Sequence, residues 1–501
     1  MLVKIDRGAP TPIHRQILEG IKALIENGTL AAGQALPPSR GLARQIGVNR
    51  STVYQAYAEL QAQGYLLCRP GSYNTVQARR KEVAYDPRRR GLIDWNRAST
   101  ENARKVHRAN LALQAARRPA RTPAAPEEKA AVDFASLEVD PRLYPLAEFR
   151  SVMSRVLLEA GPEAFRYGHP QGYAPLRAGI ARRLRLHGIS VSANDVLVTS
   201  GSQQGLDLIT RLLCPPGSRI AVECPTYARF LPLLELNGAK PVAVPMTAAG
   251  MDLDALEKVL AAGGIRFIYT MPNFQNPTGI TTAHPHRERL LTLALKHKTP
   301  ILEDGFEEDM KYFGKVPLPL KSIDEHGIVI YLGTFSKALF SGLRIGWITA
   351  DRDGIERLTA VKRFSDLSTS ALTQIAIDRF CRLGLYDLHL KRIHRVYRRR
   401  LQLTLQEMDR HMPKGVEWTR PAGGYTLWVK MARPVGAGEL RGRLARFGVA
   451  VTPGAEFFPG GGPSRHFRLC IAKPDEAEIG DGIRRLGKAL AALPAGAKER
   501  S

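Results

Sequence analysis

A lysine in the second half of the sequence is accompanied by small hydroxyl side chains and an arginine. The apolar, β-branched run Ile328–Tyr331 predicts a buried strand. Lys337 follows it, with Thr334 and Ser336 just before and Arg344 seven residues further on. An amine in this position can form an imine with an aldehyde, while the hydroxyl and guanidinium groups can hold a phosphate. Pyridoxal 5′-phosphate carries both groups, although Lys337 taken alone can equally be a solvated lysine.

Other polar side chains follow predicted strands in the same part of the chain. A tight turn between a strand and a helix carries Gly201, Ser202 and Gln203, and its backbone N–H groups can bind an anion. Tyr227 follows another strand, where it can either stack on a flat ring or belong to the core. Asn276 lies in a turn-rich loop and can donate to a phenolic oxygen, although Asn-Pro is also ordinary turn chemistry.

Two charged residues complete this constellation. Asp304 ends a buried strand, where a carboxylate is costly without a partner. A protonated pyridine nitrogen provides such a partner and makes the ring electron-withdrawing, and an arginine pair is the alternative. Arg468 can bind the carboxylate of a substrate or effector through two hydrogen bonds, or else be solvated.

Strands and helices alternate from about residue 195 onward. This pattern predicts an α/β domain with a mostly parallel or mixed seven-stranded sheet and functional loops at the carboxyl ends of its strands. Residues 355–411 are typical of long helices, and the remainder predicts a smaller α+β domain. The expected strands are Val196–Ser200, Arg219–Glu223, Pro241–Val244, Phe267–Thr270, Pro300–Glu303, Ile328–Tyr331 and Ile345–Ile348.

The first 76 residues are typical of a small α+β module, a winged helix-turn-helix. Pro12–Gly28 predicts an amphipathic helix, and Ser39 is expected to be the N-cap of a short second helix. A turn at Gly47 then leads into a helix from about Ser51 to Leu60. Gly64–Val76 predicts two short strands around a turn, which would be the wing.

Polar and basic side chains at the start of the last of these helices suit DNA, because they can reach base edges in the major groove. Arg40 and Arg44 on the preceding helix would contact the phosphate backbone, and Arg69 on the wing could enter the minor groove. The alternative is a protein–protein module with solvated arginines. The expected DNA-binding residues are Ser39, Arg40, Arg50, Ser51, Thr52 and Arg69.

Residues 77–131 hold fourteen Lys and Arg against six acidic residues, and few apolar ones. They predict a basic flexible linker, which acts either as a tether or as a further contact to DNA phosphates. The net charge of +26 likewise favours a polyanionic partner. The expected domains are therefore residues 1–76, 77–131 and 132–501.

Composition excludes several other classes of protein. The five cysteines show neither metal-ligand nor disulfide spacing, so no metal site is expected. The N-terminus lacks the apolar region of a signal peptide, and no run of about 18 apolar residues is long enough to span a bilayer. We expect a cytoplasmic protein with no membrane partner.

The N-terminal module resembles the GntR regulators, over roughly residues 10–76. The resemblance rests on Leu36–Arg40, Gly47–Val53 and Gly64–Tyr65. It implies binding to a double-stranded DNA operator. The wing departs from the usual Gly-Ser-Gly pattern of that family, since Tyr73 follows Ser72.

About 360 residues of the remainder resemble the fold-type I aminotransferases of class I and II. The resemblance implies that pyridoxal phosphate is bound through an imine with Lys337, and that Tyr167 reaches the cofactor phosphate of the partner in a homodimer. The family commonly has a tyrosine shortly after the aspartate, but Phe306 stands here, which leaves Asn276 as the main donor to the ring O3′. The matching segments are Tyr167–Gly172, Ser200–Gln204, Asn276–Gly279, Asp304, Ser336–Lys337 and Arg344.

The combination of both parts resembles the MocR/GabR family of regulators. This implies a transcription factor that binds pyridoxal phosphate and an amine or amino-acid effector, and we expect a head-to-tail homodimer. Two alternatives stay open: a working aminotransferase that carries a DNA-binding domain, and a regulator that senses pyridoxal phosphate itself. Whether the chain turns over as an enzyme is left open.

Overall fold

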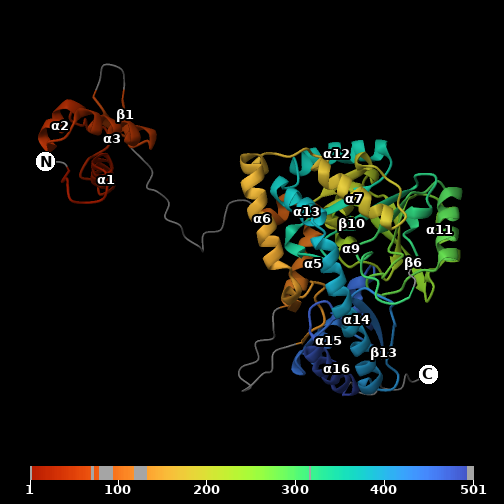
Figure 1. The fold of residues 1–501 in the computed structure, drawn as a ribbon. Helices are drawn as coiled ribbons and strands as arrows, with labels where there is room; N and C mark the ends of the chain where they lie inside the picture. The colour runs from red at the N-terminus through yellow and green to blue at the C-terminus, as the bar shows by residue number, and fades with distance from the viewer. Residues whose placement is uncertain (1–2, 69–72, 78–93, 118–131, 315–316, 493–501) are drawn as a thin grey trace. The chain divides into compact units, whose positions relative to one another are not determined.

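The computed structural model describes residues 3–68, 73–77, 94–117, 132–314 and 317–492. The chain divides into two compact units, residues 1–94 and 95–501 (Figure 1), and each is described by itself. The dividing point falls within residues 77–131. The scheme of two domains and a linker at 1–76, 77–131 and 132–501 stays a prediction.

The first unit has the predicted winged helix-turn-helix elements. Its apolar residues recur at helical spacing, and the helices bury them in one small core that includes Ile17, Leu42 and Val53. Gly47 ends the second helix in the left-handed region with φ 67°, which produces the turn. The elements are α1 (Ile13–Glu26), α2 (Ser39–Ile46), α3 (Arg50–Ala62), β1 (Leu66–Leu67) and β2 (Thr75–Val76).

The prediction that Ser39 is the N-cap of α2 was wrong. Ser39 is the first helical residue, Pro38 precedes it, and the side chain makes no capping hydrogen bond. The carbonyl of Pro38 already accepts the N–H of Leu42 at 3.0 Å, so the helix starts one residue earlier than expected. The tip of the wing, including Arg69, lies outside the described residues.

The second unit contains a mixed sheet of eight strands in the order β4-β11-β10-β9-β8-β5-β6-β7. All seven predicted strands are present, but the predicted number was wrong. The eighth, β7, is a two-residue strand that forms a hairpin with β6, and it contains no apolar run from which a strand could be predicted. The strands are β4 (Val196–Thr199), β5 (Arg219–Cys224), β6 (Lys240–Thr247), β7 (Gly250–Met251), β8 (Ile265–Thr270), β9 (Ile301–Asp304), β10 (Val329–Thr334) and β11 (Gly346–Thr349).

Successive residues of a strand pack on opposite faces of this sheet, as a pleated strand requires. Val196 and Val198 of β4 belong to one buried cluster, whereas Leu197 belongs to another. Helices therefore cover both faces (Figure 1), and the residues near 355–411 form the expected long helices. The helices before the small domain are α6 (Leu146–Ala160), α7 (Ala174–Leu186), α8 (Ser202–Leu213), α9 (Phe230–Leu236), α10 (Leu253–Ala261), α11 (His284–Lys296), α12 (Arg352–Asp366), α13 (Ala371–Arg382) and α14 (Leu385–His411).

The smaller α+β portion is a four-stranded sheet in the order β12-β13-β16-β15, with α14 and α16 packed together. A separate parallel pair joins β3 to β14, so the start of this unit is tied to its end. The elements are β3 (Val132–Asp133), β12 (Glu417–Trp418), β13 (Thr426–Val435), α15 (Ala437–Arg446), β14 (Val449–Ala450), β15 (Thr452–Pro453), β16 (Ser464–Cys470) and α16 (Glu476–Ala491).

Part of the predicted linker is helical. It forms α4 (Trp95–Ala98) and α5 (Glu101–Arg117), and α5 packs against α9 of the second unit. The rest of the predicted linker, at 78–93 and 118–131, lies outside the described residues. Within the described part of the chain, no helix is long and apolar enough to cross a membrane.

Candidate functional site

Lys337 lies in the turn that follows β10. The Lys337 Nζ donates to the carbonyl of Leu137 at 3.0 Å, and the hydroxyl of Tyr425 donates to the backbone carbonyl of Lys337 at 2.6 Å. Burial lowers the pKa of the Lys337 amine to about 8, and the nearby Glu307 carboxylate opposes this shift. Lys337 is therefore not a solvated lysine, and its amine is close to the neutral form that attacks an aldehyde.

Asp304 lies at the end of β9, opposite Leu332 of β10. The hydroxyl of Tyr269 donates to its Oδ2 at 2.9 Å, while its Oδ1 is buried without a hydrogen-bond partner among the described residues. Burial raises the pKa of this carboxyl to about 6. No arginine pairs with Asp304 within the described ranges. The open oxygen suits the N–H of a protonated pyridine ring.

A phosphate can be held where β4 turns into α8. Gly201 precedes the helix with φ 85°, and a Cβ atom there would collide with the Arg344 guanidinium. That guanidinium donates to the carbonyl of Ser200 at 3.3 Å. The hydroxyl of Ser336 is buried without a partner among the described residues. The helix N-terminus, the free hydroxyl and the guanidinium together fit an anion.

Two residues that sequence reasoning missed hold this turn in place. The Asp366 carboxylate on α12 accepts hydrogen bonds from the Gln204 amide at 2.8 Å and from the Lys362 amine at 2.9 Å. Gln204 in turn accepts the backbone N–H of Ser200 at 2.7 Å. Asp366 and Lys362 lie on a distant helix with ordinary surface spacing, so no local signal marks them.

Arg468 is a buried side chain on β16, which excludes the solvated alternative. One nitrogen donates to Asn276 Oδ1 at 3.1 Å, and the other donates to the carbonyl of Ala135 at 2.7 Å and to the hydroxyl of Thr452 at 3.2 Å. Its Nε is buried and unpartnered within the described residues. Because Arg468 occupies Oδ1 of Asn276, the amide N–H₂ of Asn276 is left to donate elsewhere.

The remaining predicted site residues differ in their surroundings. The hydroxyl of Tyr227 donates to Gln203 at 3.3 Å, and burial raises the pKa of its phenol. Phe306 is buried in the same apolar cluster as Tyr269 and has no hydroxyl to offer. Tyr167 is 85% exposed and is not enclosed with the others.

Sequence reasoning also missed Tyr269, Tyr425 and Glu307. Tyr269 lies near the end of β8, a position where the strand pattern could have indicated it. Glu307 begins a run of three acidic residues that looks like a solvated surface in the sequence. Only the fold shows that its carboxylate is 1% exposed.

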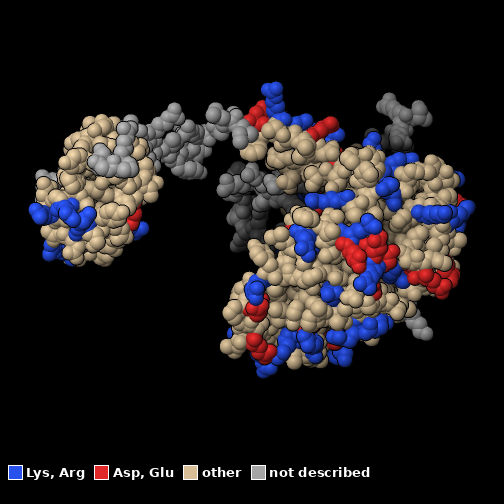
Figure 2. All heavy atoms as spheres, turned by 90° about the horizontal axis from the view of Figure 1, so that it is seen from above, with Lys and Arg blue, Asp and Glu red and all other residues tan. Residues whose placement is uncertain are grey.

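In the first unit, three of the expected DNA-binding residues, Arg40, Arg50 and Thr52, line a hollow between α2 and α3. Among the described residues, it is lined by four arginines and by no acidic residue, and Arg7 donates to the carbonyl of Gly47 at 2.6 Å. Figure 2 shows Lys and Arg side chains gathered on one part of this unit. Ser51 is exposed beside them, whereas Ser39 and Thr52 are half-buried. The arginines are Arg7, Arg40, Arg44 and Arg50.

Comparison with known proteins accounts for both units. Residues 13–75 match the bacterial regulatory proteins of the gntR family, and residues 140–486 match aminotransferase class I and II. The uncharacterized HTH-type transcriptional regulator YdcR of Escherichia coli strain K12 is 31% identical, over 95% of this chain and 98% of YdcR. The chain belongs to the MocR/GabR family. As in that family, a gntR-type DNA-binding module is fused to an aminotransferase-like domain.

The second unit of this MocR-type regulator is also similar to enzymes. The 2-aminoadipate transaminase of Thermus thermophilus is 38% identical, over 70% of this chain and 88% of that protein. The crystal structure of LysN, an α-aminoadipate aminotransferase of the same species complexed with N-(5′-phosphopyridoxyl)-L-leucine, has a TM-score of 0.73 and 34% identity. It covers 80% of this chain and 99% of LysN. The cofactor of the MocR-type regulator is pyridoxal phosphate.

Proposed function

We propose that this regulator senses an amino acid at the cofactor site of its second unit and thereby changes the affinity of its first unit for an operator. The observation that carries the proposal is Arg468. It is a buried guanidinium with an unpartnered Nε and no ion-pair partner among the described residues. A small carboxylate is the natural partner for such a group.

The residues of the site divide into groups with different roles. When bound, pyridoxal phosphate supplies an aldehyde that reacts reversibly with amines and a ring that withdraws electrons from them. Lys337 would attach the cofactor, Asp304 would accept the N–H of its ring, and Asn276 would donate to its O3′. Tyr227 would lie against the ring. The phosphate would be held by Gly201, Ser202, Gln203, Ser336 and Arg344.

We propose that the site is completed in a head-to-tail homodimer. Phe165, Tyr167, Phe364 and Leu367 are all strongly exposed. The backbone N–H of Gly168 donates to the Ser368 hydroxyl at 3.2 Å, which brings these two apolar segments together. A patch of this kind favours an interface. Because Tyr167 lies in it, the partner subunit's Tyr167 would supply the remaining phosphate contact.

The first unit would bind its operator through Arg50, Ser51 and Thr52 at the start of α3, with Ser39, Arg40 and Arg69 beside them. An effector changes operator binding only if its affinity differs between two arrangements of the protein. Displacement of Lys337 by the effector amine and capture of the effector carboxylate by Arg468 would provide that difference. We also propose a cytoplasmic location, which the DNA-binding role supports.

The test uses the full chain, operator DNA and a panel of amino acids, followed by gel shift and by cofactor absorbance. We expect one amino acid to change both signals, and Lys337→Ala to abolish both changes. If the cofactor alone changed DNA binding and no amine did so, the regulator would sense pyridoxal phosphate itself. Multiple turnovers at ordinary enzymatic rates would instead favour a working aminotransferase.

A further inference from the structure

Glu307 is a buried carboxylate that no role above uses. Its Oε2 accepts the backbone N–H of Tyr425 at 3.1 Å, whereas its Oε1 is buried without a hydrogen-bond partner among the described residues. The carboxylate also lies against Gly424, where a Cβ atom would collide with Oε2. An acid enclosed in this way needs either a cationic partner or a proton of its own.

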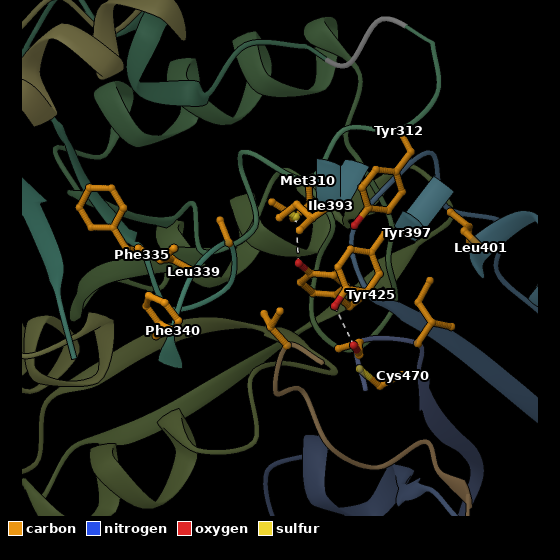
Figure 3. Close-up of a cluster of buried hydrophobic side chains, with 14 of the residues drawn as sticks. Met310, Tyr312, Phe335, Leu339, Phe340, Ile393, Tyr397, Leu401, Tyr425 and Cys470 are labelled. Carbon is orange, nitrogen blue, oxygen red and sulfur yellow. Dashed lines mark hydrogen bonds between the residues drawn. The ribbon is translucent and has the colours of Figure 1, made fainter. Parts of the chain in front are cut away.

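Tyr425 holds Glu307 and Lys337 at the same time. Its backbone N–H binds the Glu307 carboxylate, and its hydroxyl lies 2.6 Å from the Lys337 carbonyl and 3.0 Å from the sulfur of Met310. Figure 3 shows the buried cluster in which Tyr425 packs against Tyr397, with ring centroids 4.7 Å apart. Because Tyr425 is completely buried, it fixes the two residues rigidly relative to each other.

One small cavity is lined by both Glu307 and Lys337, and its volume is about 20 Å³. This is room for about one water molecule. Its other charged or titratable lining residues are Arg183, His187, Glu308 and Asp309. No ion pair joins Glu307 to Lys337 among the described residues, so a proton passes between them through a single water.

The charges around the pair make each partner depend on the other. Burial raises the pKa of Glu307 and lowers the pKa of Lys337, and the attraction between them opposes both shifts. Asp304 also favours a charged amine, whereas Arg468 and Arg229 disfavour it. Burial raises the pKa of the Cys470 thiol to about 12, which keeps it neutral. The groups that act on Glu307 or line the cavity with it are Lys337, Tyr425, Arg468, Asp304, Tyr312, Arg183, His187, Glu308 and Asp309.

We propose that Glu307 is a positioning residue that exchanges a proton with the free amine of Lys337, which rests on Lys337 being the attachment residue proposed above. The proton leaves Nζ of the ammonium and arrives at Oε1 of the carboxylate, and no other bond changes. The result is a neutral amine beside a neutral carboxylic acid. Both forms have no net charge, so Lys337 can leave and rejoin the cofactor without an unpaired buried charge.

The test follows the rate at which added pyridoxal phosphate acquires its Lys337-dependent visible absorbance in the full chain, across a series of pH values. This rate rises as the amine becomes neutral, so its midpoint reports the pKa of Lys337. In Glu307→Gln, the amide keeps the hydrogen bond from Tyr425 but provides no negative charge. We expect the midpoint to fall by about one pH unit.

Glu303→Gln is the matched control. This buried carboxylate accepts the backbone N–H groups of Leu320 at 2.7 Å and Lys321 at 2.8 Å and does not line the cavity, so the midpoint is expected to stay in place. Glu307→Asp, which keeps the charge but shortens the side chain, should lower the midpoint by a smaller amount and serves if Glu307→Gln does not fold. Midpoints equal to wild type in the variants that fold overturn the proposal. Absorbance that persists in Lys337→Ala overturns the assignment of Lys337 instead.

Discussion

The guanidinium of Arg468 donates to the side-chain oxygen of Asn276 at 3.1 Å, which joins β16 of the small sheet to a loop of the large one. The two residues are 192 positions apart in the sequence. A carboxylate bound by Arg468 would compete with Asn276 for the same donors. Capture of an effector at one residue would thus change the hydrogen bonding of the other, next to the cofactor ring.

Replacement of Arg468 by lysine tests this arrangement. Arg468→Lys keeps the charge but loses the planar, two-pronged donor geometry. We expect the affinity for the amino-acid effector to fall by about 1–3 kcal/mol, while the cofactor absorbance is retained. Titration of the holoprotein with the effector measures it. Arg465→Lys on the same strand is the control, because Arg465 is exposed. An equal loss in both variants would remove Arg468 from the effector site.

Asp304 is expected to lower stability in the absence of the cofactor. Burial raises its pKa to about 6, above the unfolded value, so the folded state gains protons that the unfolded state lacks between roughly pH 4 and 6. Stability is therefore lost as the pH rises through this window. Asp304→Asn should be more stable than wild type at neutral pH, by about 1–3 kcal/mol in denaturant unfolding of the cofactor-free chain.

Asp309→Asn is the comparison variant for Asp304→Asn, because the expected change in stability has the opposite sign. Burial alone would raise the pKa of Asp309, but His187 and Arg183 hold that pKa well below its usual range. The contribution of Asp309 to the free energy of unfolding is present above its unfolded pKa and is lost as the pH falls through its folded pKa. This variant should be less stable than wild type at neutral pH. Destabilisation of the same size in both variants would contradict the assignment of Asp304 as an unpartnered acid.

His187 gives stability a second pH dependence at higher pH. Burial alone would lower the pKa of His187, but hydrogen bonds to Asp309 and Glu308 raise that pKa to about 9. Its contribution is fully present below the unfolded pKa of about 6.5 and is lost as the pH rises towards 9. His187→Gln should cost on the order of 2 kcal/mol at pH 6 and much less at pH 10. A difference from wild type that does not change with pH would refute the ion pairs.

Arg50→Ala tests the DNA-binding face. Arg50 is exposed at the first position of α3 and lines the basic hollow. Its loss should weaken operator binding by about 1–3 kcal/mol if it contacts a base. Arg15→Ala, at another exposed arginine on α1 outside the hollow, controls for the loss of charge. Equal effects in fluorescence anisotropy at matched salt would mean that only overall charge matters.

The sequence alone predicted that Lys337, Asp304 and Asn276 belong to one site, because each follows an apolar run whose strand character is local. In a sheet whose strands are mostly parallel, such strand ends meet at one edge. The winged helix-turn-helix was predictable for a similar reason, since helical spacing and the turn at Gly47 lie within a few dozen residues.

Tertiary structure decided what those residues contact. Glu307 looks like a surface acid until the backbone of Tyr425, 118 residues later, encloses it. The sequence left a solvated Arg468 open as an alternative, whereas the structure surrounds it with Ala135, Thr452 and Asn276. The first residue of α2 and the eighth strand were also mispredicted. Local patterns set the elements, but burial and hydrogen-bond partners come from segments far apart in the chain, whose approach no short window of sequence encodes.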